Sequence, residues 1–254
     1  MILNQFKLDG KVAIVTGGAS GLGRGMALGL AEAGADIVAV GHSGNGGGIV
    51  EAVEALGRKA IYIQANLMST EPIQGIIDQA VAAFGRVDIL VNNAGIIRRE
   101  DSTQFTEQDW DDVMNINVKS VFFFCQAAAN QFLKQGGGGK IINIASMLSF
   151  QGGIRVPSYT ASKSGVKGIT MLLANEWAKE GINVNAIAPG YMATANTEQL
   201  RADEKRNAEI LGRIPADRWG TPEDLAGAAV FLASPASDYI NGYTLAVDGG
   251  WLAR

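Results

Sequence analysis

Cysteine, histidine and excess positive charge are all scarce in this sequence. The chain of 254 residues has one cysteine, Cys125, and one histidine, His42. A single cysteine excludes an internal disulfide and favours a reducing compartment, and one cysteine with one histidine argues against a zinc site. The formal net charge is −4, whereas nucleic acids and anionic membranes require basic patches. We therefore expect a cytoplasmic protein with no metal site and no nucleic-acid or membrane partner.

The sequence also lacks long apolar runs, internal repeats and linker-like segments. No run approaches the length of a membrane span, and the N-terminus lacks the pattern of a signal peptide. The chain is 47% hydrophobic and 18% charged, which is sufficient for one well-filled core. These properties predict a single domain over residues 1–254.

Strand-like apolar runs alternate along the chain with segments whose apolar residues recur at helical spacing. The predicted strands are 12–16, 36–41, 59–64, 88–92, 140–146, 183–188 and 243–247. The predicted helices are 22–33, 49–56, 71–84, 107–134, 159–179 and 222–233. This alternation predicts an α/β fold, a doubly wound parallel sheet of seven strands with helices on both faces (a Rossmann fold).

A glycine-rich turn connects the first predicted strand to the first predicted helix. Residues 16–23 read Thr-Gly-Gly-Ala-Ser-Gly-Leu-Gly. Gly17 permits a sharp turn, Gly21 permits a pyrophosphate to approach the backbone, and Gly23 permits close packing of helix on strand. The helix N-terminus then offers free N–H groups and a positive dipole end to the phosphates. The turn therefore predicts dinucleotide binding at the carboxyl ends of the strands.

The ends of the second and third predicted strands bear on the choice of cofactor. Gly41 stands where an acid would hold the ribose 2′-hydroxyl of NAD, and no arginine is present there for the 2′-phosphate of NADP. His42 can hydrogen-bond to either cofactor, although an exposed loop position explains it equally well. Asn66, which Leu67 follows, has an amide that can hydrogen-bond to an adenine ring. A simple turn residue is the alternative interpretation. We expect NAD, and NADP stays open.

A serine, a tyrosine and a lysine follow in an order that suggests proton transfer. Ser146 ends the fifth predicted strand, and Tyr159 and Lys163 share one helix face at i, i+4 spacing. Tyrosine has a pKa of about 10 in water, and one ammonium at about 4 Å contributes about 4 kcal/mol at an effective dielectric of about 20. We therefore expect Lys163 to lower the pKa of Tyr159, the base, and Ser146 to hydrogen-bond to the substrate oxygen. Without its context, the Tyr–Lys pair is a common surface helix pair.

These glycines, the Ser–Tyr–Lys set and the segment Asn92-Asn93-Ala94-Gly95 together resemble the short-chain dehydrogenase/reductase family. The resemblance covers essentially the whole chain. It implies hydride transfer between a nicotinamide cofactor and an alcohol or ketone, a homotetramer, and Asn117 as a fourth catalytic residue that holds a proton-relay water. The implied cofactor contacts are Gly17, Ser20, Gly21, Leu22, Gly23, His42, Asn66, Leu67, Asn93, Ala94, Gly95, Tyr159, Lys163, Pro189, Gly190, Met192 and Thr194.

Several stretches are similar to one group within this family, the bacterial dehydrogenases that act on keto-deoxy sugar acids from pectin and alginate breakdown. They include residues 97–101, 143–159, 188–194 and 249–254. A sugar acid requires a cation for its carboxylate, and the fork of an arginine suits it. Arg155 is the first candidate, and Arg98 and Arg99 follow, although surface or subunit-interface salt bridges explain arginines equally well. The other expected substrate contacts are Ser146, Gln151 and Tyr191.

Other functions stay open at this point. A dehydrogenase of gluconate, of another polyol, of a steroid or of an acyl thioester would keep the same catalytic residues. A non-catalytic nucleotide-binding regulator would have lost Tyr159 or Lys163, and the chain retains both. The polar segment 196–219 is expected to close over bound substrate as a lid.

Overall fold

The computed structural model describes all 254 residues, and its centre is one parallel sheet. The seven strands lie in the order β3-β2-β1-β4-β5-β6-β7, and every neighbouring pair is parallel. They are β1 Val12–Thr16, β2 Asp36–Gly41, β3 Ala60–Gln64, β4 Ile89–Asn92, β5 Gly139–Ile144, β6 Ile182–Pro189 and β7 Thr244–Val247. The predicted doubly wound sheet is confirmed, and each predicted strand overlaps an observed one.

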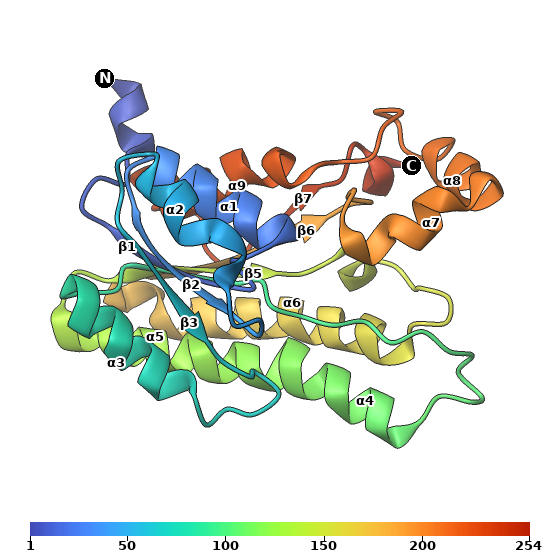
Figure 1. Ribbon diagram of the computed structural model, residues 1–254, viewed down its shortest axis with the longest axis horizontal. Helices are drawn as coiled ribbons and strands as arrows, with labels where there is room; N and C mark the ends of the chain where they lie inside the picture. Colours follow the sequence, from blue (N-terminus) through green and yellow to red (C-terminus); the bar gives the residue numbers. More distant parts are fainter.

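Helices cover both faces of this sheet (Figure 1). One face carries α1 Gly21–Glu32, α2 Ile49–Glu54 and α9 Ala226–Ala233. The other carries α3 Ile73–Phe84, α4 Glu107–Met114, α5 Ser120–Gln135 and α6 Pro157–Trp177. Two short helices, α7 Glu198–Ala202 and α8 Glu204–Leu211, lie together at one end of the molecule, near the C-terminus.

An apolar layer fills the space between the sheet and each set of helices. Met26, Leu30 and Leu232 belong to the layer under α1 and α9, whereas Phe124 and Phe132 belong to the layer under α5 and α6. The central strands β1 and β4 are buried along their whole length, so their sequences are almost continuously apolar rather than alternating. The strand order reverses between β1 and β4, and ligands bind doubly wound sheets at this switch point.

The predicted helix over residues 107–134 is wrong in one respect, because it is not continuous. A π-helical turn, Asn115–Lys119, separates α4 from α5. Within it, Asn117 is fully buried; its Oδ1 accepts from the backbone N–H of Ile96 at 2.9 Å, and its Nδ2 donates to the Ile96 carbonyl at 2.9 Å and to Ser162 Oγ at 3.2 Å. The wider π turn accommodates this side chain, and helical periodicity does not indicate the added residue.

Three smaller boundaries also differ from prediction. Strand β5 ends at Ile144 rather than at Ser146, because Ser146 Oγ accepts from the backbone N–H of Leu148 at 3.2 Å and begins a short 3₁₀ turn. Helix α6 begins at Pro157, two residues before Tyr159. The predicted helix 222–233 opens with a 3₁₀ turn before α9.

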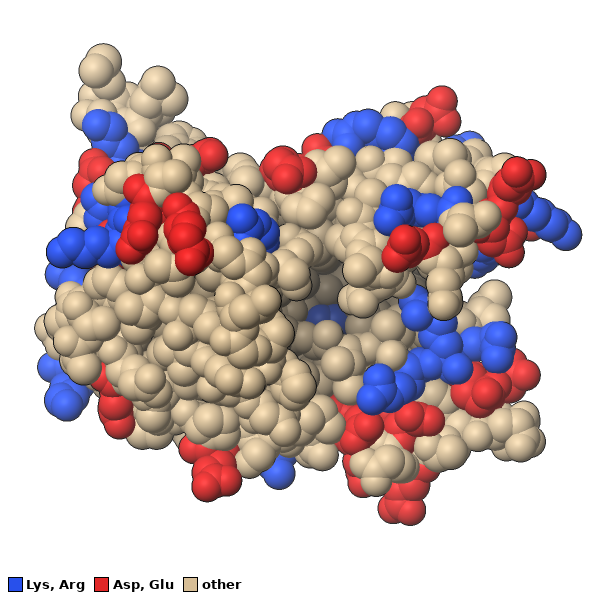
Figure 2. Space-filling view, viewed as in Figure 1, with Lys and Arg blue, Asp and Glu red and all other residues tan.

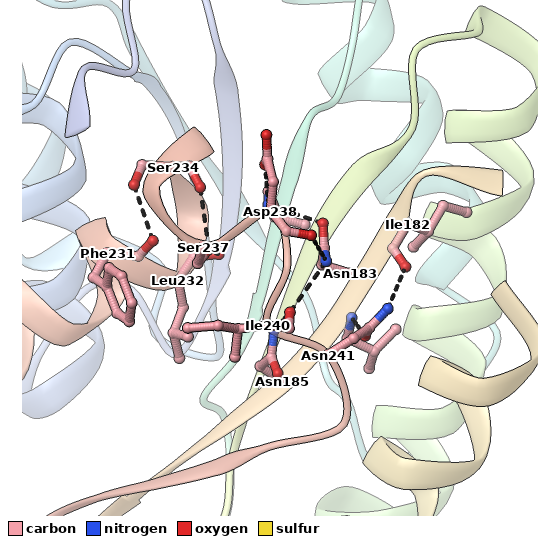
Figure 3. A network of polar contacts seen from close by, with 12 residues as sticks. Ile182, Asn183, Asn185, Phe231, Leu232, Ser234, Ser237, Asp238, Ile240 and Asn241 are labelled. Carbon is pink, nitrogen blue, oxygen red and sulfur yellow. Dashed lines mark hydrogen bonds and ion pairs between the residues drawn. The ribbon is translucent and has the colours of Figure 1, made fainter. Parts of the chain in front are cut away.

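Polar side chains of β6 anchor the connection that leads to β7 (Figure 3). Asn183 Nδ2 donates to the carbonyl oxygens of Asp238 and Ile240 at 3.0 and 3.1 Å. Asn185 Nδ2 donates to the Ile240 carbonyl at 2.8 Å. These bonds satisfy amides that lie inside the sheet and hold the last strand in place beside β6.

Two asparagines on the central strands form a second buried polar group. Asn92 Nδ2 donates to Asn143 Oδ1 at 2.9 Å, across β4 and β5. Asn143 Nδ2 in turn donates to Thr170 Oγ1 of α6 at 3.0 Å. All three residues are buried, so this network connects the strand that precedes Ser146 to the helix that carries Tyr159.

We predict that Asn143→Ala destabilises the protein by about 2 kcal/mol, because it leaves the Asn92 amide and the Thr170 hydroxyl without these partners. Urea denaturation measures the change. The matched control is Asn130→Ala, since Asn130 is exposed on α5 and its amide has no partner to lose. Equal stability of the two variants would contradict the prediction.

Candidate active site

A cleft of about 380 Å³ lies at the carboxyl ends of β1, β4, β5 and β6. Figure 2 shows a hollow in this face of the molecule, with Lys and Arg side chains along its lower right edge. The predicted site residues that line the cleft are Gly17, Ser20, Gly21, Leu22, Asn93, Ala94, Gly95, Ser146, Tyr159, Lys163, Pro189, Gly190, Met192 and Thr194. Residues from distant parts of the chain therefore converge at the switch point of the sheet.

Thr16, the last residue of β1, holds two walls of this cleft together. Its Oγ1 accepts from the backbone N–H groups of Asn93 and Ala94, both at 3.0 Å. Asn93 Nδ2 donates to the Thr16 carbonyl at 2.9 Å. The glycine turn and the Asn93–Gly95 segment are thus fixed to each other, a contact that the sequence analysis did not identify.

The glycine turn leaves no room for larger side chains. Gly17 has φ +65°, and a Cβ placed on it would lie 2.7 Å from Asn93 Nδ2. A Cβ on Gly23 would lie 2.2 Å from the Gly17 carbonyl oxygen, so Gly23 packs helix on strand as predicted and does not line the cleft. Ser20, the N-cap of α1, makes no side-chain cap hydrogen bond. The first N–H groups of this helix stay available to an anion, which fits a dinucleotide pyrophosphate.

Ser146, Tyr159 and Lys163 meet in the cleft. Lys163 Nζ donates to the Ile144 carbonyl at 2.6 Å and lies 5.6 Å from the centre of the Tyr159 ring. Ser149 Oγ donates to the Lys163 carbonyl at 2.6 Å, which fastens the loop after β5 to α6. The arrangement places a hydroxyl, a phenol and an amine around one reacting position.

Burial shifts the pKa values of Tyr159 and Lys163 in opposite directions. It raises the pKa of Tyr159 above its ordinary value, and neither the Ser146 hydrogen bond nor the positive charge of Arg99 offsets it. Burial also lowers the pKa of Lys163 to about 8. The expectation that Lys163 lowers the pKa of Tyr159 is therefore wrong for the protein alone, because desolvation disfavours the phenolate and the ammonium is bonded to a backbone carbonyl. Tyr159 is a neutral phenol at neutral pH.

Four other predicted site residues lie away from this cleft. His42 follows β2 with an exposed side chain, and Asn66 Oδ1 accepts from the Met68 N–H at 3.1 Å in an exposed turn after β3. Leu67 is buried. Their strands end at the same edge of the sheet as β1, farther from the catalytic end. Asn117 clamps the backbone of Ile96, and its role in holding a water stays a prediction.

Apart from Ser146 and Arg99, the predicted substrate contacts do not line the cleft. Arg155 has φ +61° and forms ion pairs with Glu100 and Asp101, both at 3.0 Å. Arg98 pairs with Asp109 at 3.2 Å and with Asp112 at 3.3 Å.

Gln151 and Tyr191 are held elsewhere by the C-terminal aromatic residues. Gln151 Oε1 accepts from Trp251 Nε1 at 3.3 Å. The Tyr191 ring packs edge-on against Trp219 and Trp251. Side chains engaged in this way are not presented to the cleft. The spacing of residues along the chain does not reveal these contacts.

Arg99 does line the cleft, together with residues that the sequence analysis did not single out. These are Ile96, Ile97, Ala195, Asn196 and Thr197. The position of Ile96 and Ile97 in the sequence could have indicated their place in the site, since they directly follow the Asn93–Gly95 segment. Asn196 and Thr197 belong to the segment predicted to act as a lid, and Ala195 directly precedes it. The closure of this segment stays a prediction.

A family model described as Enoyl-(Acyl carrier protein) reductase matches residues 17–252. The chain belongs to the short-chain dehydrogenase/reductase family. It is 68% identical over 254 residues to the 2-dehydro-3-deoxy-D-gluconate 5-dehydrogenase of Escherichia coli strain K12, and the match covers 100% of both chains.

Solved structures of this family share the fold closely. An Agrobacterium tumefaciens protein assigned as a 2-deoxy-D-gluconate 3-dehydrogenase, with bound NADP, is 54% identical with a TM-score of 0.93, over 99% of this chain and 100% of that one. The gluconate 5-dehydrogenase of Burkholderia cenocepacia J2315, in complex with NADP and tartrate, is 38% identical with a TM-score of 0.95, over 100% of both chains.

Two further observations concern the whole molecule. None of its helices combines the length and apolar content needed to cross a membrane. No group of three His, Cys, Asp or Glu side chains is placed to hold a metal ion.

We predict that Tyr159 does not ionise below about pH 10 in the unliganded protein, because burial raises its pKa above the ordinary value of a tyrosine. Ultraviolet absorbance near 295 nm, where phenolate absorbs, measures this as the difference between wild type and Tyr159→Phe across a pH titration. A phenolate signal at neutral pH that disappears in the variant would refute the prediction.

Proposed function

We propose that this short-chain dehydrogenase/reductase oxidises the hydroxyl at carbon 5 of 2-dehydro-3-deoxy-D-gluconate, with a nicotinamide dinucleotide as hydride acceptor. The observation that carries the proposal is the convergence of Ser146, Tyr159 and Lys163 with the glycine turn on one cleft. The full-length similarity to a relative of that activity supports the substrate. The reverse reaction is reduction of the ketone.

Different residues of the chain bind the cofactor, bind the substrate and transfer the proton. The dinucleotide, when bound, supplies the hydride acceptor or donor. The glycine turn and the N-terminus of α1 hold its pyrophosphate. Ser146 donates a hydrogen bond to the substrate oxygen as that oxygen becomes a carbonyl. Tyr159 takes the hydroxyl proton during oxidation and returns it during reduction.

Lys163 supports the proton transfer by charge. Because its pKa is about 8, most of its amine is an ammonium at neutral pH. That charge, beside the Tyr159 ring at 5.6 Å from its centre, favours the phenolate once the proton has left. Asn117 acts indirectly, since it fixes the backbone of Ile96, which lines the cleft.

The proposed enzyme uses both NAD and NADP. Gly41 offers no carboxylate for the ribose, and a Cβ at this position would lie 2.7 Å from the Tyr62 hydroxyl oxygen. An acidic side chain that selects NAD by repelling a 2′-phosphate therefore does not fit here without movement of Tyr62. The bound NADP of two structural relatives supports the use of NADP.

A gluconate 5-dehydrogenase is the second candidate function. The likeness to the Burkholderia cenocepacia enzyme, solved with NADP and tartrate, favours it. Gluconate would use the same Ser146, Tyr159 and Lys163, so the two candidates differ in substrate rather than in chemistry.

The proposal extends to a cytoplasmic homotetramer that acts in the breakdown of pectin. Exposed apolar side chains on α5 and α6, Phe123, Met171 and Leu172, and the exposed Tyr239 and Tyr243 near β7 support assembly. Contacts between copies through these surfaces would remove them from water.

We predict that Tyr159→Phe lowers kcat for 2-dehydro-3-deoxy-D-gluconate by at least about 100-fold, because the proton acceptor is lost. Initial rates with NAD and with NADP, against this acid and against D-gluconate, measure the effect. The control Tyr239→Phe removes a hydroxyl from an exposed tyrosine and leaves kcat unchanged. Undiminished activity of Tyr159→Phe would overturn the mechanism, and turnover of gluconate alone would overturn the substrate.

For the assembly, we expect light scattering to give about four times the chain mass of 26.6 kDa. Replacing Met171 and Leu172 with Glu should shift the mass downwards, since like charges would then face each other across a buried contact. A stable wild-type monomer would be incompatible with the proposed tetramer.

A further inference from the structure

Ser149 ends the short 3₁₀ turn that follows β5, between the strand end that leads to Ser146 and the helix that carries Lys163. Its Oγ donates to the Lys163 carbonyl at 2.6 Å and accepts from the backbone N–H of Ser146 at 3.3 Å. A carbonyl oxygen can only accept and a backbone N–H can only donate, so these partners fix the direction of the single hydroxyl proton. One hydroxyl group therefore joins the backbones of two of the proposed catalytic residues.

The turn that Ser149 closes also orients the hydroxyl of Ser146. The Ser149 N–H donates to the Ser146 carbonyl at 2.9 Å, and the Leu148 N–H donates to Ser146 Oγ at 3.2 Å. Because Leu148 uses a lone pair of this oxygen, the hydroxyl proton of Ser146 is left for another acceptor. Ser146 forms a hydrogen bond with Tyr159, and both line the cleft.

Lys163 is held against the end of β5 by two separate bonds. Its Nζ donates to the carbonyl of Ile144, the last residue of β5, at 2.6 Å. Its own carbonyl accepts from Ser149. The first bond fixes the amine relative to the sheet, and the second fixes the turn of α6 from which the side chain extends.

We propose that Ser149 is a positioning residue for proton transfer, whose hydroxyl sets the placement of Ser146 relative to Lys163 and so the geometry around Tyr159. The inference rests on the proposed function, in which these residues act on the substrate hydroxyl. A misplacement of about 1 Å can cost about 100-fold in rate. Ser149 therefore affects kcat although it does not line the cleft.

The experiment compares three variants of Ser149 with wild type on 2-dehydro-3-deoxy-D-gluconate. Ser149→Ala should lower kcat by about 10- to 100-fold and change KM for the acid and for the cofactor by less than about twofold, because geometry is lost while no ligand-binding group is removed. Ser149→Thr keeps the hydroxyl and should restore most of kcat. Ser149→Cys keeps the size but offers only a weak donor and acceptor, so its kcat should fall as in Ser149→Ala.

The pH profile of kcat separates positioning from a general loss of structure. The charged groups near Tyr159 are Lys163 on the same helix and Arg99 from the segment after β4. Ser149→Ala releases only the first, so the tyrosine limb of the profile should move to higher pH, because the phenolate loses part of a favourable positive charge. A smaller folded fraction would lower the whole profile and leave its limb in place.

The matched control is Ser164→Ala. Ser164 Oγ donates to the Leu148 carbonyl at 3.4 Å, so it also joins this turn to α6, but its hydroxyl bonds neither Ser146 nor Lys163. Its kcat and its pH limb should match those of wild type. If Ser164→Ala lost as much activity as Ser149→Ala, the proposal would be overturned, because any contact between the turn and the helix would then suffice.

Two results for Ser149 itself would also overturn the positioning role. One is wild-type kcat in Ser149→Ala or Ser149→Cys, and the other is a fall in kcat with the pH limb unmoved. Tyr159→Phe is assayed in parallel, since undiminished activity of that variant overturns the proposed mechanism and the positioning role with it. An inactive Tyr159→Phe beside a fully active Ser149→Ala overturns the positioning role alone.

Discussion

The contact between Thr16 and the segment after β4 is the constraint on which the site depends. One hydroxyl accepts the N–H groups of both Asn93 and Ala94, so the glycine turn of β1 cannot separate from the neighbouring wall of the cleft. A buried acceptor with two donors leaves few alternative arrangements. From this point the chain continues past Ile96, clamped by Asn117, to Arg99. The position of Arg99 relative to the glycine turn is therefore fixed by this series of backbone contacts.

Desolvation affects the pKa values of Tyr159 and Lys163 more than their proximity to each other does. Burial raises the pKa of Tyr159 and lowers the pKa of Lys163 to about 8, so in the protein alone a neutral phenol lies beside an amine that is still largely protonated at neutral pH. The cost of the phenolate is then met only when further positive charge enters the cleft. This gives a physical reason for Tyr159, the proposed base, to lose its proton with ligands in place rather than in the free protein.

Ion pairing distinguishes the arginines near the mouth of the cleft. Arg155 adopts a left-handed backbone conformation and pairs with two acids, and Arg98 pairs with two others. These exposed pairs contribute little to stability. Their consequence is electrostatic, because they neutralise the acids that would otherwise compete for Arg99.

The sequence by itself determined the α/β class, the seven strands, and the order and identity of the glycine turn and of Ser146, Tyr159 and Lys163, because apolar periodicity and glycine chemistry are local properties. Tertiary structure alone decided the π turn at Asn117, the pKa shifts and the choice among the arginines. Those depend on burial and on partners far apart in the chain: Asn117 bonds Ile96, and Arg155 reaches Glu100. Spacing carries no information on which acid neutralises which arginine, since that pairing exists only once the chain has folded.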